Sequence, residues 1–312
     1  MKGPLFYSKI LLFGEYGIIK DSKGLSIPYN FYNGALKVEE NPSEIAIKSN
    51  KGLKLFAEYL VELQKNNPEL VSFNMKALNT DIERGMYFDS TIPQGYGVGS
   101  SGALVAAIYD EYATDKITVL ENLTRNKLLK LKEIFGEMES FFHGKSSGLD
   151  PLNSYLSIPI LINSKDNIEP AGIPSQTANG KGAVFLLDSG ITGETAPMVH
   201  IFMENMKMEP FRKMLKEQFV KHTDACVDDF LQGDVNSLFG NIKKLSHVVL
   251  NNFKPMIPPQ FHKLWKAGIE TNDYYLKLCG SGGGGYILGF TEDIDKAKIA
   301  LKDYKLEIVY NF

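Results

Sequence analysis

The stretch PQGYGVGSSGALVAAIY, residues 93–109, places four glycines and two serines directly before a run of small apolar residues. The run from Ala103 onward is typical of a buried helix. Upstream, GMYFDSTI (residues 85–92) has the β-branched and aromatic content of a strand. Glycine tolerates positive φ, and a helix N-terminus offers unpaired N–H groups and partial positive charge. The stretch therefore predicts a strand–loop–helix unit whose loop suits a phosphate group.

A structural interpretation of the same residues stays open at this point. Glycine-rich turns commonly precede helices, and Ser100 and Ser101 could be N-caps and nothing more. The loop lacks the Gly-Lys-Ser/Thr ending of a Walker A loop, and its glycine spacing is not that of the dinucleotide fingerprint. The missing strand–helix–strand repetition also argues against a dinucleotide-binding oxidoreductase.

Composition limits the class of protein. The chain has 312 residues, which is too long for one ordinary core and sufficient for two domains. Its net charge of −3, without a basic block, argues against nucleic-acid binding. No apolar run approaches the roughly twenty residues of a membrane helix. With two cysteines there is no disulfide framework, so we expect a cytoplasmic protein in which both are buried.

Patterns along the chain predict an α+β protein with two domains. The N-terminal domain, residues 1–192, reads as mixed α/β, whereas residues 193–312 begin with long helical patterns and end in alternating strands. Strand patterns cover residues 5–16, 34–40, 43–49, 85–92, 183–190, 274–280, 286–290 and 305–310. Helical patterns cover residues 53–66, 103–109, 118–144, 210–232, 234–253 and 294–304, with Gly144 as a C-cap.

Three glycine-containing motifs follow one another in a recognisable order. The first runs from Lys9 to Glu15, and the last is the hairpin Gly280–Gly285. Between them, a proline, three residues and Gly-x-Gly-Ser-Ser are filled by Pro93, Gly97, Gly99, Ser100 and Ser101. In this the chain resembles the GHMP kinases over nearly its whole length. The resemblance implies their two-domain fold, with a phosphate loop before a helix in the N-terminal domain and a ferredoxin-like α+β C-terminal domain.

Within that family, the segment HGKSSGLD (residues 143–150) is similar to the mevalonate kinases. The resemblance implies ATP-dependent phosphorylation of the primary hydroxyl of mevalonate, with ATP and Mg²⁺ as cofactors. Tyr16 departs from the histidine usual there, and Thr195 lacks the usual basic neighbour. Phosphomevalonate kinase or another small-molecule kinase is the alternative, and a non-catalytic metabolite-binding relative is a third. A homodimer and feedback regulation are left open.

The resemblance also assigns roles to individual residues. Asp150 would be the base for the acceptor hydroxyl, with Lys9 as its electrostatic partner. Ser101 and Glu139 would hold Mg²⁺. The ATP-binding residues would be Gly95, Gly97, Val98, Gly99, Ser100, Ser101 and Gly102. The substrate-binding residues would be Glu15, Tyr16, Ser147, Thr195, Gly282 and Gly283.

Each of these residues also has a structural interpretation. Asp150 before proline is a good helix N-cap, and Lys9 could be a surface charge at the end of a strand. Glu139 lies at the edge of an apolar helical stripe, where a solvated charge is common. His143 in the last helical turn is favoured by the helix dipole.

Overall fold

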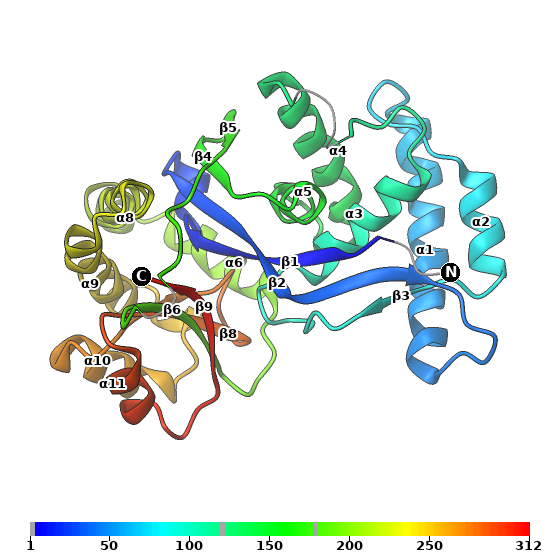
Figure 1. Cartoon of the computed structure of the whole chain (residues 1–312). Helices are drawn as coiled ribbons and strands as arrows, with labels where there is room; N and C mark the ends of the chain where they lie inside the picture. The colour runs from blue at the N-terminus through cyan, green and yellow to red at the C-terminus, as the bar shows by residue number, and fades with distance from the viewer. Residues whose placement is uncertain (1–3, 119–122, 178–179) are drawn as a thin grey trace. The chain divides into compact units, whose positions relative to one another are not determined.

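The computed structural model describes residues 4–118, 123–177 and 180–312, and these residues group into two compact units (Figure 1). The first unit contains the described residues up to Lys9 together with Pro28–Pro93 and Gly99–Ile158. The second contains Ile10–Ile27, Gln94–Val98 and Pro159–Phe312. The chain thus passes repeatedly from one unit to the other. The domain boundary at residue 192 stays a prediction.

Two long strands contribute residues to both units. Strand β1 (Phe6–Phe13) passes from the first unit to the second after Lys9, and β2 (Gly24–Lys37) returns at Pro28. The hydrogen-bonded strand order of this sheet is β1-β2-β4-β5, with β3 paired to β2. The pairing of Gly34–Lys37 with β3 is antiparallel and lies in the first unit.

The first unit is completed mainly by helices. Its elements are α1 (Glu44–Asn66), α2 (Met75–Glu83), β3 (Tyr87–Ser90), α3 (Ser100–Tyr112), α4 (Arg125–His143) and α5 (Leu149–Leu156). Helix α3 packs against both α4 and α5. It is buried along most of its length because its side chains are small and apolar. This packing places the start of α3 beside the end of α4 and the start of α5.

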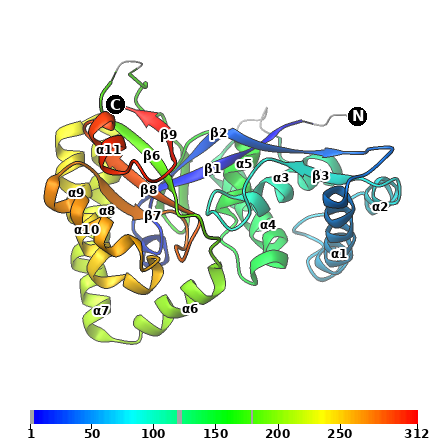
Figure 2. The same ribbon diagram turned by 90° about the horizontal axis from the view of Figure 1, so that it is seen from below.

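The second unit contains a four-stranded antiparallel sheet with the order β7-β8-β6-β9. The strands are β6 (Ala183–Asp188), β7 (Tyr275–Leu278), β8 (Tyr286–Thr291) and β9 (Leu306–Asn311). Because helices separate β6 from β7 and β8 from β9, this is the ferredoxin-like arrangement that the resemblance to the GHMP kinases implies. Helix α9 packs along β7 and β8 (Figure 2).

The remaining elements of the second unit are mostly helical. They are η1 (Gly17–Lys20), β4 (Ile160–Ser164), β5 (Asn167–Pro170), α6 (Thr195–Asn205), α7 (Glu209–Met214), the π-turn η2 (Leu215–Val220), α8 (Lys221–Gln232), α9 (Val235–Asn252), η3 (Lys254–Met256), α10 (Phe261–Thr271) and α11 (Ile294–Ala300). Both cysteines, Cys226 and Cys279, are buried in this unit, as predicted.

The strand predicted at residues 43–49 is wrong, because these residues open α1. Ser43 caps the helix by accepting a hydrogen bond from the Ala46 amide, at 3.2 Å. Ile45 and Ile47, whose alternation suggested a strand, are both exposed. The local cap therefore outweighs the β-propensity of the two isoleucines.

The long helix predicted at residues 118–144 is confirmed over α4, and Gly144 is its C-cap. Residues 119–122 of that prediction lie outside the described residues. Four of the five apolar positions on its stripe are buried: Leu128, Leu131, Phe135 and Met138, while Phe142 is exposed. Among the helices in the described ranges, none is long and apolar enough to span a membrane.

Candidate active site

The serines that follow the glycine loop do not cap helix α3. Its N-cap is Gly99, with φ +82°, and no side chain bonds to the first-turn amides. Instead the Ser101 Oγ donates to Glu139 Oε1 at 2.9 Å and lies 2.9 Å from His143 Nε2. The capping interpretation is therefore wrong, and the hydroxyl of Ser101 faces two polar side chains of α4.

Glu139 is a buried carboxylate held by two serine hydroxyls. It is 4% exposed, and besides the bond from Ser101 it accepts one from Ser146 Oγ at 2.5 Å. Burial, and to a lesser degree the charge of Asp150, raise the pKa of Glu139 to about 7. The solvated-edge interpretation is wrong, because a buried acid of this kind requires polar partners or a cation.

Lys9 and Asp150 form an ion pair inside the first unit. The Lys9 Nζ lies 2.7 Å from Asp150 Oδ1, and the side chains are 4% and 38% exposed respectively. Helix α5 begins at Leu149 with Gly148 as its N-cap, so Asp150 lies in the first turn and does not cap the helix. Lys9 is buried in β1, so it is not a surface charge. The pair presents a partly exposed carboxylate beside a buried ammonium group.

Two glycines of the loop permit this pair to form. A Cβ on Gly99 would lie 3.1 Å from Cγ of Lys9. A Cβ on Gly102 would lie 2.7 Å from the carbonyl carbon of Asp150. Both values are closer than ordinary side-chain packing allows, so these glycines let α3 approach the strand and helix that carry the pair. The sequence suggested only contacts with phosphate for these positions.

The preceding loop segment, Gly95–Val98, belongs to the second unit, where it packs backbone to backbone. Gly95 and Gly97 have φ of +76° and +78°. The Gly193 amide donates to the Gly95 carbonyl at 2.9 Å, and a Cβ on Gly97 would lie 2.7 Å from the Cys279 carbonyl oxygen. Glycine is therefore required here both for its backbone conformation and for close approach. Val98 is buried, so its side chain is closed to a ligand.

The glycine hairpin Gly280–Gly285 packs on this loop segment through its two ends. A Cβ on Gly280 would lie 3.2 Å from Gly97 Cα, and one on Gly285 would lie 2.4 Å from Tyr96 Cα. The middle of the hairpin faces elsewhere. A Cβ on Gly282 or Gly283 would instead approach the Met256 carbonyl oxygen or the Met198 side chain, respectively.

The predicted substrate-binding residues are only partly gathered. Tyr16 OH donates to the Ser281 carbonyl at 2.7 Å, and Ser281 Oγ donates to Thr195 Oγ1 at 3.4 Å. Ser147 lies in the other unit and is exposed, and its Oγ accepts from the Leu149 amide at 3.4 Å. Its neighbour Ser146, which the sequence analysis did not single out, contacts Glu139 instead.

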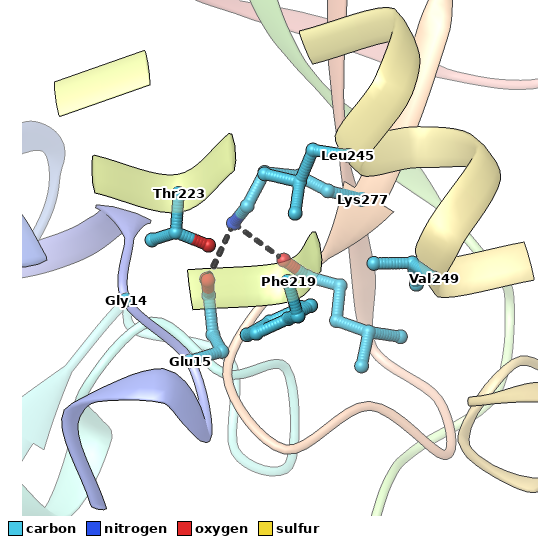
Figure 3. Close-up of a pocket in the computed structure, with 8 residues that line it drawn as sticks. Gly14, Glu15, Phe219, Thr223, Leu245, Val249 and Lys277 are labelled. Carbon is cyan, nitrogen blue, oxygen red and sulfur yellow. Dashed lines mark hydrogen bonds and ion pairs between the residues drawn. The ribbon is translucent and has the colours of Figure 1, made fainter. Parts of the chain in front are cut away.

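Glu15 is turned away from solvent and is bound to Lys277. The Lys277 Nζ donates to both carboxylate oxygens, at 2.6 and 2.7 Å, and to the Leu278 carbonyl at 2.9 Å (Figure 3). Beside the pair is a cavity of about 10 Å³, also lined by Thr223. Lys277 is not among the site residues predicted above, although a lysine inside the apolar strand pattern YLKL signals a buried partner.

No group of three or more His, Cys, Asp or Glu side chains gathers as a metal site within the described residues. The donor set at Ser101 and Glu139 is one hydroxyl and one carboxylate, separated by 2.9 Å. Mg²⁺ commonly takes one or two protein oxygens and completes its shell with phosphate and water. The two residues therefore fit Mg²⁺ accompanied by phosphates.

Comparison with known proteins agrees with this fold. Residues 58–157 match the family model for the GHMP kinases N terminal domain. The chain therefore carries a GHMP kinase N-terminal domain, and its overall fold is that of the GHMP kinases. No curated protein matched the sequence significantly.

Solved structures match at low sequence identity over nearly the whole chain. A mevalonate kinase from L. major, in complex with R-mevalonate, has a TM-score of 0.62 and 16% identity, covering 97% of this chain and 90% of its own. Streptococcus pneumoniae phosphomevalonate kinase, in complex with phosphomevalonate and AMPPNP, has a TM-score of 0.62 and 13% identity, covering 98% of each chain. Lactococcus lactis galactokinase, complexed with galactose, has a TM-score of 0.60 and 10% identity, covering 98% and 92%.

Proposed function

We propose that this protein is an ATP-dependent kinase that phosphorylates the primary hydroxyl of mevalonate, giving 5-phosphomevalonate and ADP. The observation that carries the proposal is the Lys9–Asp150 pair, in which a partly exposed carboxylate lies 2.7 Å from a buried ammonium group. The GHMP kinase fold supports a small-molecule kinase. The mevalonate kinases among the structural neighbours support this substrate.

In the proposed reaction Asp150 accepts the proton of the acceptor hydroxyl as its oxygen attacks the γ-phosphorus of ATP. The new O–P bond forms while the bond from the γ-phosphorus to the β,γ-bridging oxygen breaks, and ADP leaves. Lys9 places positive charge beside the carboxylate and the reacting oxygens. Phosphoryl transfer depends mainly on such alignment and charge neutralisation, because there is little covalent chemistry for the protein to do.

Backbone amides of the loop from Gly95 to Gly102 would bind the phosphates, since this loop leads into the N-terminus of α3. Ser101 and Glu139 would hold Mg²⁺, which when bound neutralises phosphate charge. Glu139, with its pKa raised to about 7, needs a nearby cation to be stably ionised in its buried position. The serine and the glutamate therefore fit a nucleotide-bound cation.

Electrostatics favour mevalonate over phosphomevalonate as the acceptor. The segments at residues 14–19, 143–151 and 191–197 contribute one Lys or Arg, Lys145, against the additional acid Glu194. Lys277 is already neutralised by Glu15. A second phosphate near the transferred group requires more positive charge than this. We expect a specificity constant for mevalonate about a hundredfold above that for phosphomevalonate, equivalent to about 2.7 kcal/mol.

A coupled ADP-release assay over mevalonate, phosphomevalonate, homoserine and galactose tests the proposal. The Asp150→Asn protein is the blank for contaminating kinases. Mevalonate should give the highest kcat/KM, and product analysis should find the phosphate on the primary hydroxyl. Equal kcat/KM on mevalonate and phosphomevalonate would favour the phosphomevalonate kinase alternative. Nucleotide binding without transfer to any alcohol would favour the non-catalytic relative.

A further inference from the structure

Two consecutive residues after strand β1 both contact residues near the C-terminal end of the sequence. Glu15 binds Lys277 through both carboxylate oxygens, and Tyr16 donates to the Ser281 carbonyl at 2.7 Å. Lys277 is in β7 and Ser281 is in the glycine hairpin, so the two contacts bracket the start of that hairpin. All four residues belong to the second unit.

The Glu15–Lys277 contact is closed to ligands. The side chains are 5% and 4% exposed, and the ammonium group also binds the Leu278 carbonyl. Apolar side chains of Phe219, Leu245 and Val249 line the same small space. A carboxylate that is 5% exposed and binds one buried ammonium group through both oxygens leaves almost no accessible surface for a substrate hydroxyl. Glu15 therefore acts on the protein itself.

Tyr16 is held equally firmly. Its ring stacks on Phe202 with centroids 4.6 Å apart, and Phe253 lies at 6.0 Å. Its φ is +58°, a conformation that is strained for a non-glycine residue and persists only where surrounding contacts impose it. Burial raises the pKa of the phenol, as does the nearby Glu15 charge, so the hydroxyl stays a donor.

The hairpin in turn determines where the loop segment Gly95–Val98 lies. Gly280 and Gly285 approach Gly97 and Tyr96 too closely for any side chain, and the Tyr286 amide donates to the Tyr96 carbonyl at 3.3 Å. Five glycines in six hairpin residues leave the free backbone many conformations. Contacts from outside the hairpin must therefore select the one that packs on the loop segment.

We infer that Glu15 and Tyr16 are positioning residues, which hold the glycine hairpin so that the loop segment Gly95–Val98 keeps the conformation that binds the phosphates of ATP. The inference rests on the proposed function for the identity of the ligand. It replaces the predicted substrate-binding role of both residues with an action on the nucleotide loop through Lys277 and Ser281.

Tyr16→Phe is the cleanest test, because it removes only the hydroxyl and keeps the ring stacked on Phe202. We expect KM for ATP and Kd for AMPPNP to rise about three- to tenfold, as expected for one lost hydrogen bond. KM for the alcohol and kcat should stay within about twofold. Glu15→Gln should raise KM for ATP and Kd for AMPPNP at least as much. If Glu15→Gln folds poorly, Tyr16→Phe alone still tests the inference.

Trp265→Phe is the matched control for a loss of stability. Trp265 is buried in the same unit and donates to the Ser246 carbonyl and hydroxyl, on α9. Its substitution should lower the midpoint of unfolding without changing KM for ATP. Hydrogen exchange gives a readout independent of catalysis: the amides of Gly283, Gly285 and Tyr286 should exchange faster in Tyr16→Phe than in Trp265→Phe.

The outcomes separate the two proposals. Failure of the wild-type protein to bind AMPPNP would contradict the proposed function, and with it the nucleotide part of the inference. If the wild type binds AMPPNP and Tyr16→Phe has the same Kd and the same hairpin exchange, the inference alone is overturned. A rise in KM for the alcohol with unchanged KM for ATP would return Tyr16 to the substrate site.

Discussion

Two lysine–carboxylate pairs among the described residues have a buried lysine and nearly the same closest distance, but different surroundings. Lys9 lies 2.7 Å from Asp150 in the first unit, and Lys277 lies 2.6 Å from Glu15 in the second. Both lysine side chains are 4% exposed. Asp150 is 38% exposed, however, whereas Glu15 is only 5% exposed. The exposure of the acid, and not the ion pair itself, separates a candidate base from a structural contact.

The difference has a physical cause. Burying both charges carries a large desolvation cost, which only well-placed hydrogen bonds repay, and Lys277 makes three. A carboxylate that must meet a substrate has to keep part of its surface accessible. We call Lys9–Asp150 the open pair and Lys277–Glu15 the closed pair, and we expect the open pair to affect activity and the closed pair to affect stability.

Asp150→Asn should reduce phosphoryl transfer at least about a thousandfold, because the amide cannot accept the proton. Kd for AMPPNP should stay within a few-fold, since the proposed role of Asp150 concerns the acceptor. Steady-state assays and nucleotide titration measure the two quantities. Asp228→Asn, in an exposed pair with Lys23, is the control and should keep wild-type turnover. Near-normal turnover of Asp150→Asn would remove this residue from the mechanism.

Lys277→Met should lower the free energy of unfolding by about 3–5 kcal/mol, because it removes the ammonium group that both oxygens of the buried Glu15 carboxylate bind. Urea unfolding measures the change. Lys266→Met, in an exposed pair with Glu270, should cost less than about 1 kcal/mol. Combining Lys277→Met with Glu15→Met should recover much of the loss. A single variant as stable as the wild type would mean that the closed pair contributes nothing.

Glu139 gives a pH-dependent prediction. Its folded-state pKa is raised to about 7 from about 4.5, so the folded protein binds more protons than the unfolded chain between these pH values. Its contribution to stability is therefore lost as pH rises from about 4.5 to 7. In EDTA, Glu139→Gln should remove this decline, by about 1–3 kcal/mol. Urea unfolding at pH 5 and pH 8 measures the change in the free energy of unfolding. The same change between the two pH values in the wild type and in Glu139→Gln would contradict the prediction.

Glu139→Gln and Ser101→Ala should each raise the Mg²⁺ concentration for half-maximal activity and lower turnover, because each removes a proposed ligand. Mg²⁺ titration at saturating ATP makes the measurement. Thr80→Ala is the control, since Thr80 is exposed on α2 of the same unit and its hydroxyl donates to the Lys76 carbonyl. Unchanged half-saturation in both ligand variants would contradict the metal assignment.

Thr223→Val should change the free energy of unfolding by less than about 1 kcal/mol, because the Thr223 Oγ1 is buried without a hydrogen-bond partner in the described structure. Thr291→Val is the control. The Thr291 Oγ1 donates to carbonyl oxygens of Asp273 and Asp293, at 2.7 and 2.9 Å, and its loss should cost about 1–3 kcal/mol. A large loss in Thr223→Val would show that Thr223 supports the closed pair.

The sequence was most informative where chemistry and spacing act locally. The strand, glycine loop and helix around residues 93–109, the helix ending at Gly144 and the ferredoxin-like C-terminal part are all confirmed. It was least informative where a long-range partner decides. The wrong strand at residues 43–49 came from isoleucines that the fold leaves in solvent. Local alternation cannot reveal which face another element will cover.

The candidate site shows the same limit. Lys9 and Asp150 could be paired from the family motif, and the structure brings them together. Glu15 ends the first motif and Tyr16 follows it, so both were assigned to the substrate, yet their partners Lys277 and Ser281 lie more than 260 positions away. Ser146 and Ser147 are adjacent serines in the loop between α4 and α5, and only the conformation of that loop places the former on Glu139. The motifs therefore predicted where the site lies, but they did not predict which residue each side chain contacts.

Segments of the two units alternate along the chain, and synthesis of the first unit is complete before that of the second. Every segment of the first unit has been made once Ile158 is added, so the Lys9–Asp150 pair can form early. Glu15 must wait for Lys277, 262 residues later, which is about 13–50 seconds of translation at ordinary ribosome speeds. During that interval residues 10–27 lack the C-terminal partners of their own unit. The nascent chain therefore passes through a stage in which the first unit is complete and the mostly apolar segment at residues 10–27 is exposed, so that chaperones can bind it.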